Sequence, residues 1–204
     1  MKKQLLLILI FSFHLSSLYS SIQVVNTTCE YMSNPLGVSG PYPRLSWQLY
    51  SDFNDVSQTA FEILVSSSED LLNKNIGDCW TSGKVYSSDN IHIYYRGSEL
   101  LPFKRYYWKV RVYDKQDQSS KWSNTAWFET AMLSEYDWKA KWISDGSKQF
   151  NRDEEFYEDD RMPLFRKDFL ITKKVESARL YICGLGYYEA YMNGKRIGDN
   201  MLEP

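Results

Sequence analysis

Three side chains near the end of the chain alternate in a pattern that could bind a sugar. Tyr187, Glu189 and Tyr191 lie two residues apart in a strand-like run, so we expect them to share one face of a strand. Two aromatic rings and a carboxylate on one face suit sugar binding, because flat rings stack on the apolar faces of pyranoses. An ordinary solvent-facing strand explains the same residues, and the sequence leaves that alternative open.

The residues after this run predict a β-hairpin. Asn193-Gly194 favours a type I′ turn, in which both central residues have positive φ, and Lys195 to Gly198 then forms the returning strand. Asp199 and Asn200 follow it and could supply oxygen ligands of the kind that Ca²⁺ prefers. Calcium is the one cofactor that the sequence suggests, and solvent-facing turn residues remain the alternative.

The densest carboxylate cluster lies in a long polar segment between residues 144 and 161. Its members are Asp153, Glu154, Glu155, Glu158, Asp159 and Asp160. A catalytic or Ca²⁺-binding pair is one interpretation, but no apolar residues surround the cluster to raise a pKa or exclude water. We therefore expect a solvated acidic loop and no catalytic residues in this chain. Gly184-x-Gly186 lacks the third glycine of a dinucleotide-binding loop.

The cysteines do not predict a metal site. Cys29, Cys79 and Cys183 form no CxxC motif, and the two histidines do not complete a zinc ligand set. Cys29 and Cys79 could pair in an oxidising compartment, although buried thiols explain them as well.

Composition and the first residues suggest an exported protein. The net charge of −2 with scattered Lys and Arg argues against nucleic acid as a partner. Residues 1–21 have the basic start, apolar middle and small polar end of a signal peptide, and the apolar run is shorter than the ~20 residues of a membrane span. We expect periplasmic or extracellular localisation, with no membrane span after cleavage.

Residues 22–132 alternate in the manner of a two-sheet β-sandwich. Helical periodicity is nearly absent, apart from one turn near Asp70 to Asn73. In the longest strand Tyr106, Trp108, Val110 and Val112 share one face, while Lys109 and Arg111 are expected to face solvent. The predicted strands are an irregular first strand within 22–31, then 44–49, 61–65, 80–85, 91–95, a long strand within 100–114, and 126–130.

A second domain is expected over residues 138–204. Alternation predicts strands at 138–143, 164–169, 178–183 and 187–192 before the returning strand. Tyr188, Ala190 and Met192 should form the core side of the fourth of these. The fold class is therefore all-β, with a sandwich followed by a second antiparallel sheet.

Two sets of motifs resemble known families. The first set resembles a fibronectin type III or immunoglobulin-like domain, in which a tyrosine hydroxyl at the corner before the long strand bonds to nearby backbone: Leu45-Ser46-Trp47, Leu100-x-Pro102-x-x-x-Tyr106 and Ser120-x-Trp122-Ser123. The second set resembles the N-terminal region of bacterial α-L-rhamnosidases of glycoside hydrolase family 78: Asn34-Pro35-Leu36-Gly37, Pro43-Arg44-Leu45-Ser46-Trp47, Tyr107 to Asp114, Trp138-x-Ala140-x-Trp142-Ile143, Phe165-Arg166-Lys167-x-Phe169 and Gly184 to Asp199.

This resemblance implies a fibronectin-like domain and a jelly-roll-type β-sandwich that is truncated at Pro204. In such enzymes further β modules and an (α/α)₆ barrel follow, and the barrel hydrolyses terminal α-L-rhamnose. Some modules of this region bind rhamnose with Ca²⁺. We therefore expect a non-catalytic N-terminal part of an exported α-L-rhamnosidase that scaffolds the missing catalytic domain and could bind rhamnose-containing glycans. The alternative is a free-standing carbohydrate-binding or adhesion module.

Overall fold

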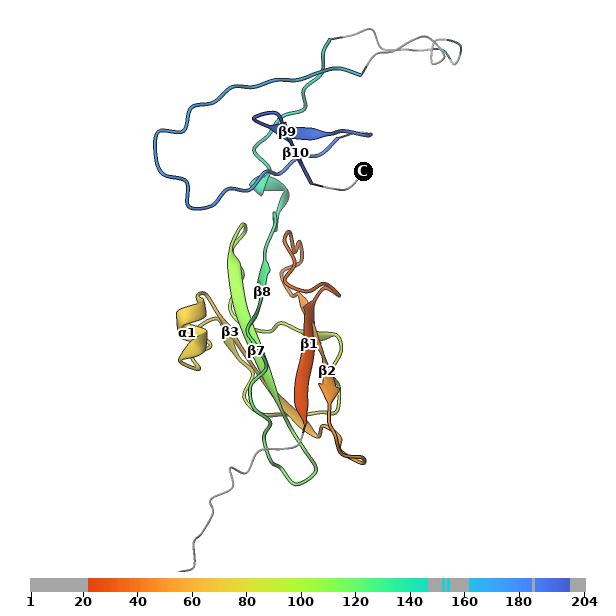
Figure 1. Ribbon diagram of the computed structural model, residues 1–204, viewed down its shortest axis with the longest axis vertical. Coiled ribbons are helices and arrows are strands. Elements are labelled where there is room, and N and C mark those ends of the chain that lie inside the picture. Colours follow the sequence, from red (N-terminus) through yellow and green to blue (C-terminus); the bar gives the residue numbers. More distant parts are fainter. Residues whose placement is uncertain (1–21, 147–151, 153, 155–161, 185, 199–204) are drawn as a thin grey trace, which may run out of the picture. The chain divides into compact units, whose positions relative to one another are not determined.

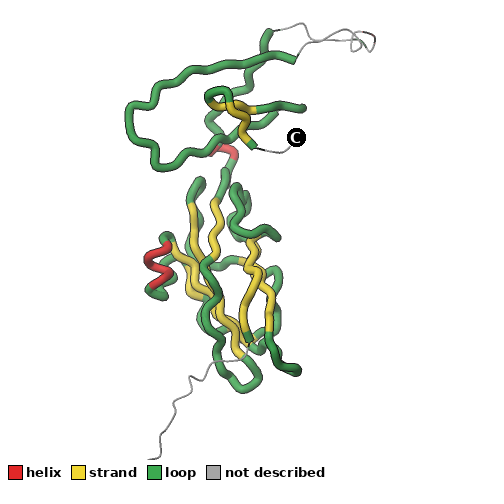
Figure 2. The backbone as a smooth tube through the Cα atoms, in the orientation of Figure 1, coloured by secondary structure: helices red, strands yellow, loops and turns green. Residues whose placement is uncertain are grey.

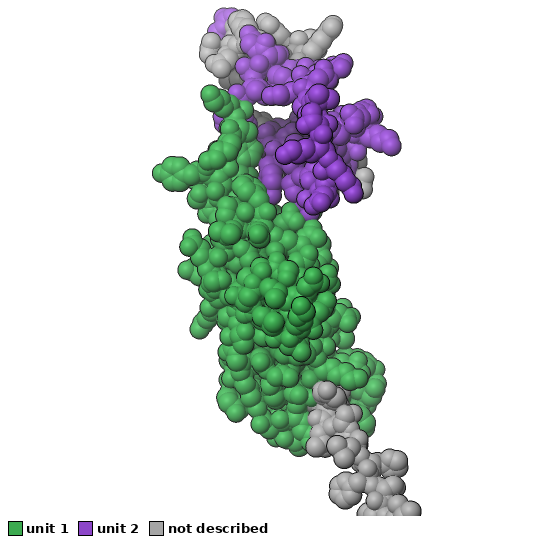
Figure 3. Space-filling model, turned by 90° about the vertical axis from the view of Figure 1, so that its left-hand side faces the viewer, with its two compact units in different colours: residues 1–141 green, residues 142–204 purple. Residues whose placement is uncertain are grey.

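The computed structural model describes residues 22–146, 152, 154, 162–184 and 186–198. The chain divides into two compact units, residues 1–141 and 142–204, which Figure 3 colours separately. The predicted signal peptide and most of the acidic segment lie outside the described residues.

The first unit is a sandwich of two antiparallel sheets (Figure 1). One sheet has the order β1–β2–β6, and the other has the order β4–β3–β7–β8, with β5 also paired to β3. The strands are β1 (Gln23–Cys29), β2 (Arg44–Tyr50), β3 (Ala60–Ser66), β4 (Trp80–Thr81), β5 (Val85–Tyr86), β6 (Ile93–Tyr94), β7 (Arg105–Tyr113) and β8 (Ala126–Glu129). The prediction of an all-β, immunoglobulin-like sandwich is confirmed.

The core lies between these sheets and follows from the alternation of each strand. Leu45 and Trp47 of β2 face Phe61 and Ile63 of β3, and all four are at most 3% exposed. The four inward residues predicted for β7 are buried as well. Pairing across β3 and β7 runs without interruption from Ala60–Tyr113 to Ser66–Tyr107, which makes this pair of strands the longest regular ladder.

Side-chain hydrogen bonds hold two irregular parts of the sandwich. The Leu101 amide donates to the Tyr106 hydroxyl at 2.8 Å, which confirms the predicted tyrosine corner. Buried Trp47 donates from Nε1 to Gln58 Oε1 at 3.0 Å, and Gln58 Nε2 donates to two loop carbonyls, of Ser87 and Asp89. These bonds satisfy polar groups that would otherwise be buried without a partner.

Lys109 corrects one sequence prediction. It lies on the outer face of β7 but is only 7% exposed, because the short helix α1 (Glu69–Asn73) and its following turn cover it. Its ammonium group donates to the Leu72 carbonyl at 2.6 Å and to Asn75 Oδ1 at 2.7 Å. Burial lowers the pKa of Lys109, since a charged amine loses hydration there. The prediction that it faces solvent is therefore wrong.

Several strands begin or end at residues other than those predicted. Residues 80–85 form β4 and β5 instead of one strand, with Gly83 at φ +63° between them, and β6 is shorter than predicted. The irregularity predicted in β1 is a register shift between Val25 and Thr28, where Asn26 has φ +47°. Such a bulge bends an edge strand and weakens its ability to pair with another chain.

The second unit contains one hairpin among its described residues. Strands β9 (Ala190–Met192) and β10 (Lys195–Ile197) flank Asn193 and Gly194, whose φ values of +50° and +76° confirm the predicted turn. Residues 164–169 and 178–183 are not strands, and Figure 2 draws them as loop. Residues 138–143, which fall on both sides of the unit boundary, are not a strand either. A strand exists only where a neighbour accepts its hydrogen bonds, and alternation alone does not supply that neighbour.

The expected core side of the hairpin is not buried. Tyr188 and Ala190 are partly exposed and Met192 is 40% exposed, because two strands alone have no second layer to cover them. Large apolar side chains elsewhere in this unit, such as Leu164 and Leu170, are 99% and 87% exposed. The described part of the second unit therefore lacks the packed core of the first.

This contrast predicts the outcome of limited proteolysis. A protease needs locally opened backbone, and a unit without a packed core opens far more often than one with a continuous buried core. We expect a resistant fragment that covers approximately residues 22–132, with rapid cleavage between residues 142 and 198, detected by mass spectrometry of the digestion products. Equal resistance of both units would contradict the contrast.

Candidate functional site

The hairpin brings together two of the three predicted sugar-binding residues. The Tyr191 hydroxyl donates to Glu189 Oε2 at 2.7 Å, and this hydrogen bond, with the nearby negative charge, raises the pKa of Tyr191. Arg196 Nη2 lies 3.5 Å from Glu189 Oε1 and belongs to the residue directly opposite Tyr191. The sequence reasoning missed Arg196, although a two-residue turn at Asn193-Gly194 pairs position 191 with position 196.

The remaining predicted residues are not placed in this cluster. Tyr187 precedes β9 and is 74% exposed, and no hydrogen bond in the described part of the chain joins it to Glu189 or Tyr191. Asp199 and Asn200, the predicted calcium ligands, lie outside the described residues. Among the described residues, no group of three or more His, Cys, Asp or Glu side chains is arranged to hold a metal ion.

The cysteines are free thiols in the structure, so the Cys29–Cys79 pair considered from the sequence is not formed. Burial, with a smaller effect of Glu30, raises the pKa of Cys29 to about 12. Burial also raises the pKa of Cys79 to about 11. Neither thiol is ionised near neutral pH, and neither can act as a nucleophile there.

A second polar cluster lies at the end of β1 and the start of β2. Glu30 accepts three hydrogen bonds from Arg44: from the backbone amide at 2.6 Å, from Nε at 3.0 Å and from Nη2 at 2.5 Å. These bonds lower the pKa of Glu30, because they favour its charged form. The two side chains are only a quarter to a third exposed, so the pair is a fixed part of the surface.

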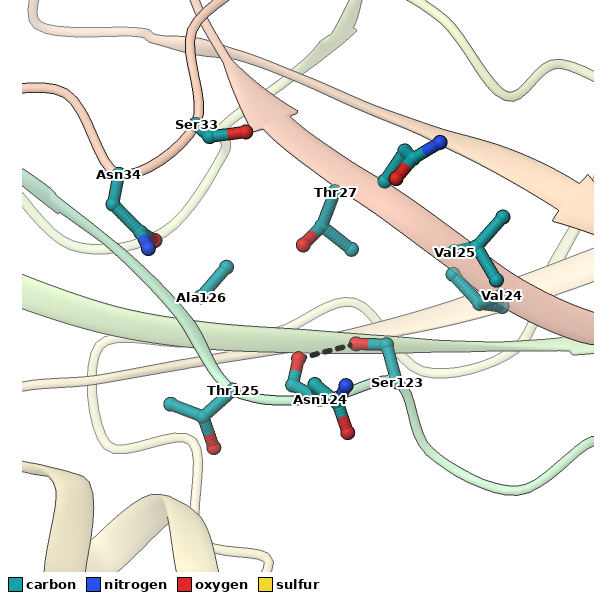
Figure 4. Close-up of a pocket in the computed structure, with 10 residues that line it drawn as sticks. Val24, Val25, Thr27, Ser33, Asn34, Ser123, Asn124, Thr125 and Ala126 are labelled. Atoms are coloured by element: carbon teal, nitrogen blue, oxygen red, sulfur yellow. Dashed lines mark hydrogen bonds between the residues drawn. The ribbon is translucent and has the colours of Figure 1, made fainter.

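A hollow of about 360 Å³ lies between β1 and the segment that leads into β8 (Figure 4). The lining contains amide, hydroxyl and small apolar side chains: Val24, Val25, Asn26, Thr27, Ser33, Asn34, Ser123, Asn124, Thr125 and Ala126. None of these side chains titrates near neutral pH, so the hollow cannot supply a general acid or base. Three of its polar side chains are already engaged. Ser123 Oγ donates to the Asn124 carbonyl, Asn34 Oδ1 accepts from the Trp127 amide, and Asn26 Nδ2 donates to Gln48 Oε1.

Comparisons with known proteins identify the family. The family model described as "Rha78A-like, N-terminal immunoglobulin domain" matches residues 24–134, which is more than half of the chain. The chain belongs to this family. A second family model, "Alpha-L-rhamnosidase N-terminal domain", matches residues 173–204. The resemblance to the N-terminal region of α-L-rhamnosidases inferred from the sequence motifs is thereby confirmed.

Two relatives show how much of a rhamnosidase the family region covers. An α-L-rhamnosidase of Formosa agariphila is 37% identical over an alignment 217 residues long. The alignment covers 98% of this chain and 23% of the relative. An α-L-rhamnosidase of Streptomyces avermitilis is 40% identical over 125 residues, which cover 61% of this chain and 12% of the relative. The chain thus spans less than a quarter of the length of either enzyme.

Solved structures of the family agree with the fold of the first unit. The α-L-rhamnosidase of Dictyoglumus thermophilum matches with a TM-score of 0.58 and 46% identity over 59% of this chain and 14% of that one. The Streptomyces avermitilis α-L-rhamnosidase complexed with L-rhamnose matches with a TM-score of 0.58 and 40% identity. The match covers 60% of this chain and 12% of that one. The Aspergillus terreus enzyme, at 21% identity and a TM-score of 0.51, supports the fold alone.

The Glu30–Arg44 pair predicts a specific pH dependence of stability. Because the folded pKa of Glu30 lies below its ordinary value, the pair stabilises the fold fully above the ordinary glutamate pKa and loses this effect as the pH falls through the folded pKa. We expect Glu30→Gln to lower the free energy of unfolding at pH 7, with the difference from wild type shrinking below pH ~4. Urea unfolding of wild type and variant at pH 7 and below pH ~4 measures this difference in the free energy of unfolding.

The matched control is Glu99→Gln, since Glu99 is exposed and lies outside the Glu30–Arg44 pair. It should leave the free energy of unfolding nearly unchanged at both pH values. A Glu30→Gln difference that stays constant between neutral and acidic pH would contradict the role assigned to the ion pair.

Proposed function

We propose that this chain acts as the non-catalytic N-terminal part of an exported α-L-rhamnosidase, in which the intact enzyme removes terminal α-L-rhamnose from rhamnosides. Its role is to scaffold the catalytic domain and to hold rhamnose-containing glycans near it. The family membership and the small share of each relative that the chain spans support this proposal. The catalytic domain and the glycan are the proposed partners.

The observation that carries the non-catalytic role is the engagement of the buried and part-buried carboxylates of the sandwich. Asp114 accepts hydrogen bonds from the backbone amides of Gln116 and Gln118. Glycoside hydrolysis needs one carboxyl group that stays protonated near neutral pH, and a second that attacks or activates water. In the sandwich, Glu30, Glu62 and Glu129 each form an ion pair with an arginine, at 2.5, 2.6 and 3.1 Å. For Glu30 the hydrogen bonds from Arg44 lower the pKa, which is the opposite of what a general acid requires.

Capture of the sugar is assigned to the hairpin. The Tyr191 ring, 58% exposed, offers a stacking surface, and Glu189, held by Tyr191 and Arg196, offers carboxylate oxygens to sugar hydroxyls. Tyr187 supplies a second exposed ring. We include Ca²⁺ bound by Asp199 and Asn200 in this proposal, because their oxygens suit that ion.

Calorimetry with L-rhamnose tests the sugar capture. We expect weak binding by the full chain, no hydrolysis of an aryl α-L-rhamnoside, and a loss of affinity of about tenfold in Tyr191→Ala, which corresponds to one aromatic stacking contact. Titrations with and without Ca²⁺ test the metal. Tyr136→Ala is the control, because Tyr136 is 85% exposed and lies in the other unit. A folded chain that binds no rhamnose would contradict the capture role.

Export has its own test. Residues 1–21 have the composition of a signal peptide, and the helices within the described residues are all too short or too polar to cross a membrane. We expect mass spectrometry of the protein from the culture medium or periplasm to find an N-terminus near Ile22. Retention of Met1 in the cytoplasmic fraction would contradict export.

A further inference from the structure

A strained turn presents a tyrosine on the outer face of the β1–β2–β6 sheet. The Cys29 amide donates to the Met32 carbonyl at 2.9 Å, and the Met32 amide donates to the Cys29 carbonyl at 3.0 Å, so Glu30 and Tyr31 are the two central residues of a tight hairpin. Their φ values are +47° and +65°. Turns of this kind favour Asn-Gly, and a bulky side chain in the second position is disfavoured.

Strain of this kind persists only where the surroundings hold it, and it is often associated with function. Here the Glu30–Arg44 pair holds the first turn residue. Arg44 also donates from Nη1 to the Tyr31 hydroxyl at 3.0 Å, and its guanidinium carbon lies 4.8 Å from the centre of the Tyr31 ring. The Tyr31 hydroxyl lies 2.8 Å from His92 Nε2, and the two rings meet edge to face. The ring therefore has a fixed position.

The fixed ring is nevertheless open to solvent. Tyr31 is 63% exposed, and Tyr94, which lies directly opposite Arg44 in the sheet, is 52% exposed. The Tyr31 ring lies against the guanidinium, and Tyr94 is the cross-strand neighbour of Arg44 on the same face of the sheet. The result is a surface of two exposed rings around an arginine, with a histidine at its edge.

The charge of this surface favours a neutral ligand. Arg44 and Glu30 cancel each other, and their hydrogen bonds keep both ionised. Because the two opposite charges offset each other, the pair exerts little net attraction on an anion or on a cation. Exposed aromatic rings beside hydrogen-bonding groups are suited to a neutral pyranose, whose C–H face stacks on a ring while its hydroxyls bind polar groups.

We infer that Tyr31, Tyr94, Arg44 and His92 form a second binding site for a neutral sugar, on the sandwich and separate in sequence from the hairpin. The site goes beyond the proposed capture by Glu189 and Tyr191, and only the choice of L-rhamnose as the first probe rests on the proposed function. Strain in the turn is the cost of presenting the ring of Tyr31 at a position where glycine would fit better.

The decisive variant is Tyr31→Gly in the full chain. Glycine adopts positive φ without strain, so this variant should unfold at the same or a higher denaturant concentration than the wild type while its sandwich site loses rhamnose binding. Tyr86→Gly is the control, since Tyr86 is 76% exposed and lies on β5 in the other sheet. It should retain sugar binding at the site.

Nuclear magnetic resonance of His92 gives a local readout of the titration. The sequence contains two histidines, and His14 lies in the predicted signal peptide, so a chain prepared from Ile22 onward has His92 as its one imidazole ring. We expect saturable shifts of this signal with L-rhamnose, a loss of about tenfold or more in affinity in Tyr31→Gly, and much weaker shifts with D-glucuronate, which carries a negative charge.

The outcomes separate the two proposed sites. Loss of the His92 response in Tyr31→Gly, with the response retained in Tyr191→Ala, supports the sandwich site whatever the hairpin does. Rhamnose binding that disappears only in Tyr191→Ala, or a His92 signal that no sugar shifts, would overturn it and leave the hairpin proposal standing. Stronger binding of glucuronate than of rhamnose, or a Tyr31→Gly variant that is less stable yet still binds, would overturn it as well.

Discussion

The burial of two tryptophans between the sheets is the constraint on which the rest of this structure depends. Trp47 and Trp108 are 1% and 0% exposed, and Trp47 packs edge to face against Phe61 with ring centres 5.2 Å apart. A buried indole N–H is usually hydrogen-bonded, and Gln58 accepts that of Trp47 while also holding the loop before β6. Among the described residues, Trp108 Nε1 is buried without such a partner, so packing alone holds that indole. The core and this connection are therefore fixed together.

The same constraint produces the surface chemistry. Because side chains alternate along a strand, the inward position of Leu45 and Trp47 forces Arg44 and Ser46 outward. Arg44 then meets Glu30 from the β1 turn and lies opposite Tyr94 of β6. A slip of one residue in β2 would bury the guanidinium and expose the indole, so the core also enforces the register of the site.

The sequence predicted the features that depend on local periodicity. Alternation identified the inward residues of β2 and β7, and Asn193-Gly194 identified the hairpin turn, because each is determined by neighbours along the chain. Lys109 could not be placed in this way, since its burial comes from α1, which lies 36 residues or more earlier in the chain. The same holds for residues 178–183, where alternation was present but the described residues form no strand.

The residues of the candidate sites show the same difference between local and long-range features. Glu189 and Tyr191 were found because they belong to one strand, whereas Arg196 needed the cross-strand register. The cluster around Arg44 joins β1, β2 and β6, so no single stretch of sequence contains its pattern. The feature that reveals this cluster is a backbone conformation, because Tyr31 has φ +65° in a turn that favours glycine.

The central claim is that the surface around Arg44 is built in advance to receive a neutral sugar. The most direct measurement is a crystal structure of the full chain grown with methyl α-L-rhamnopyranoside at saturating concentration. The account predicts a pyranose stacked on the ring of Tyr31, with the turn still in its positive-φ conformation and the Glu30–Arg44 hydrogen bonds intact. A sugar bound elsewhere with Tyr31 facing empty solvent, or a Glu30–Tyr31 turn that relaxes to negative φ, would contradict it.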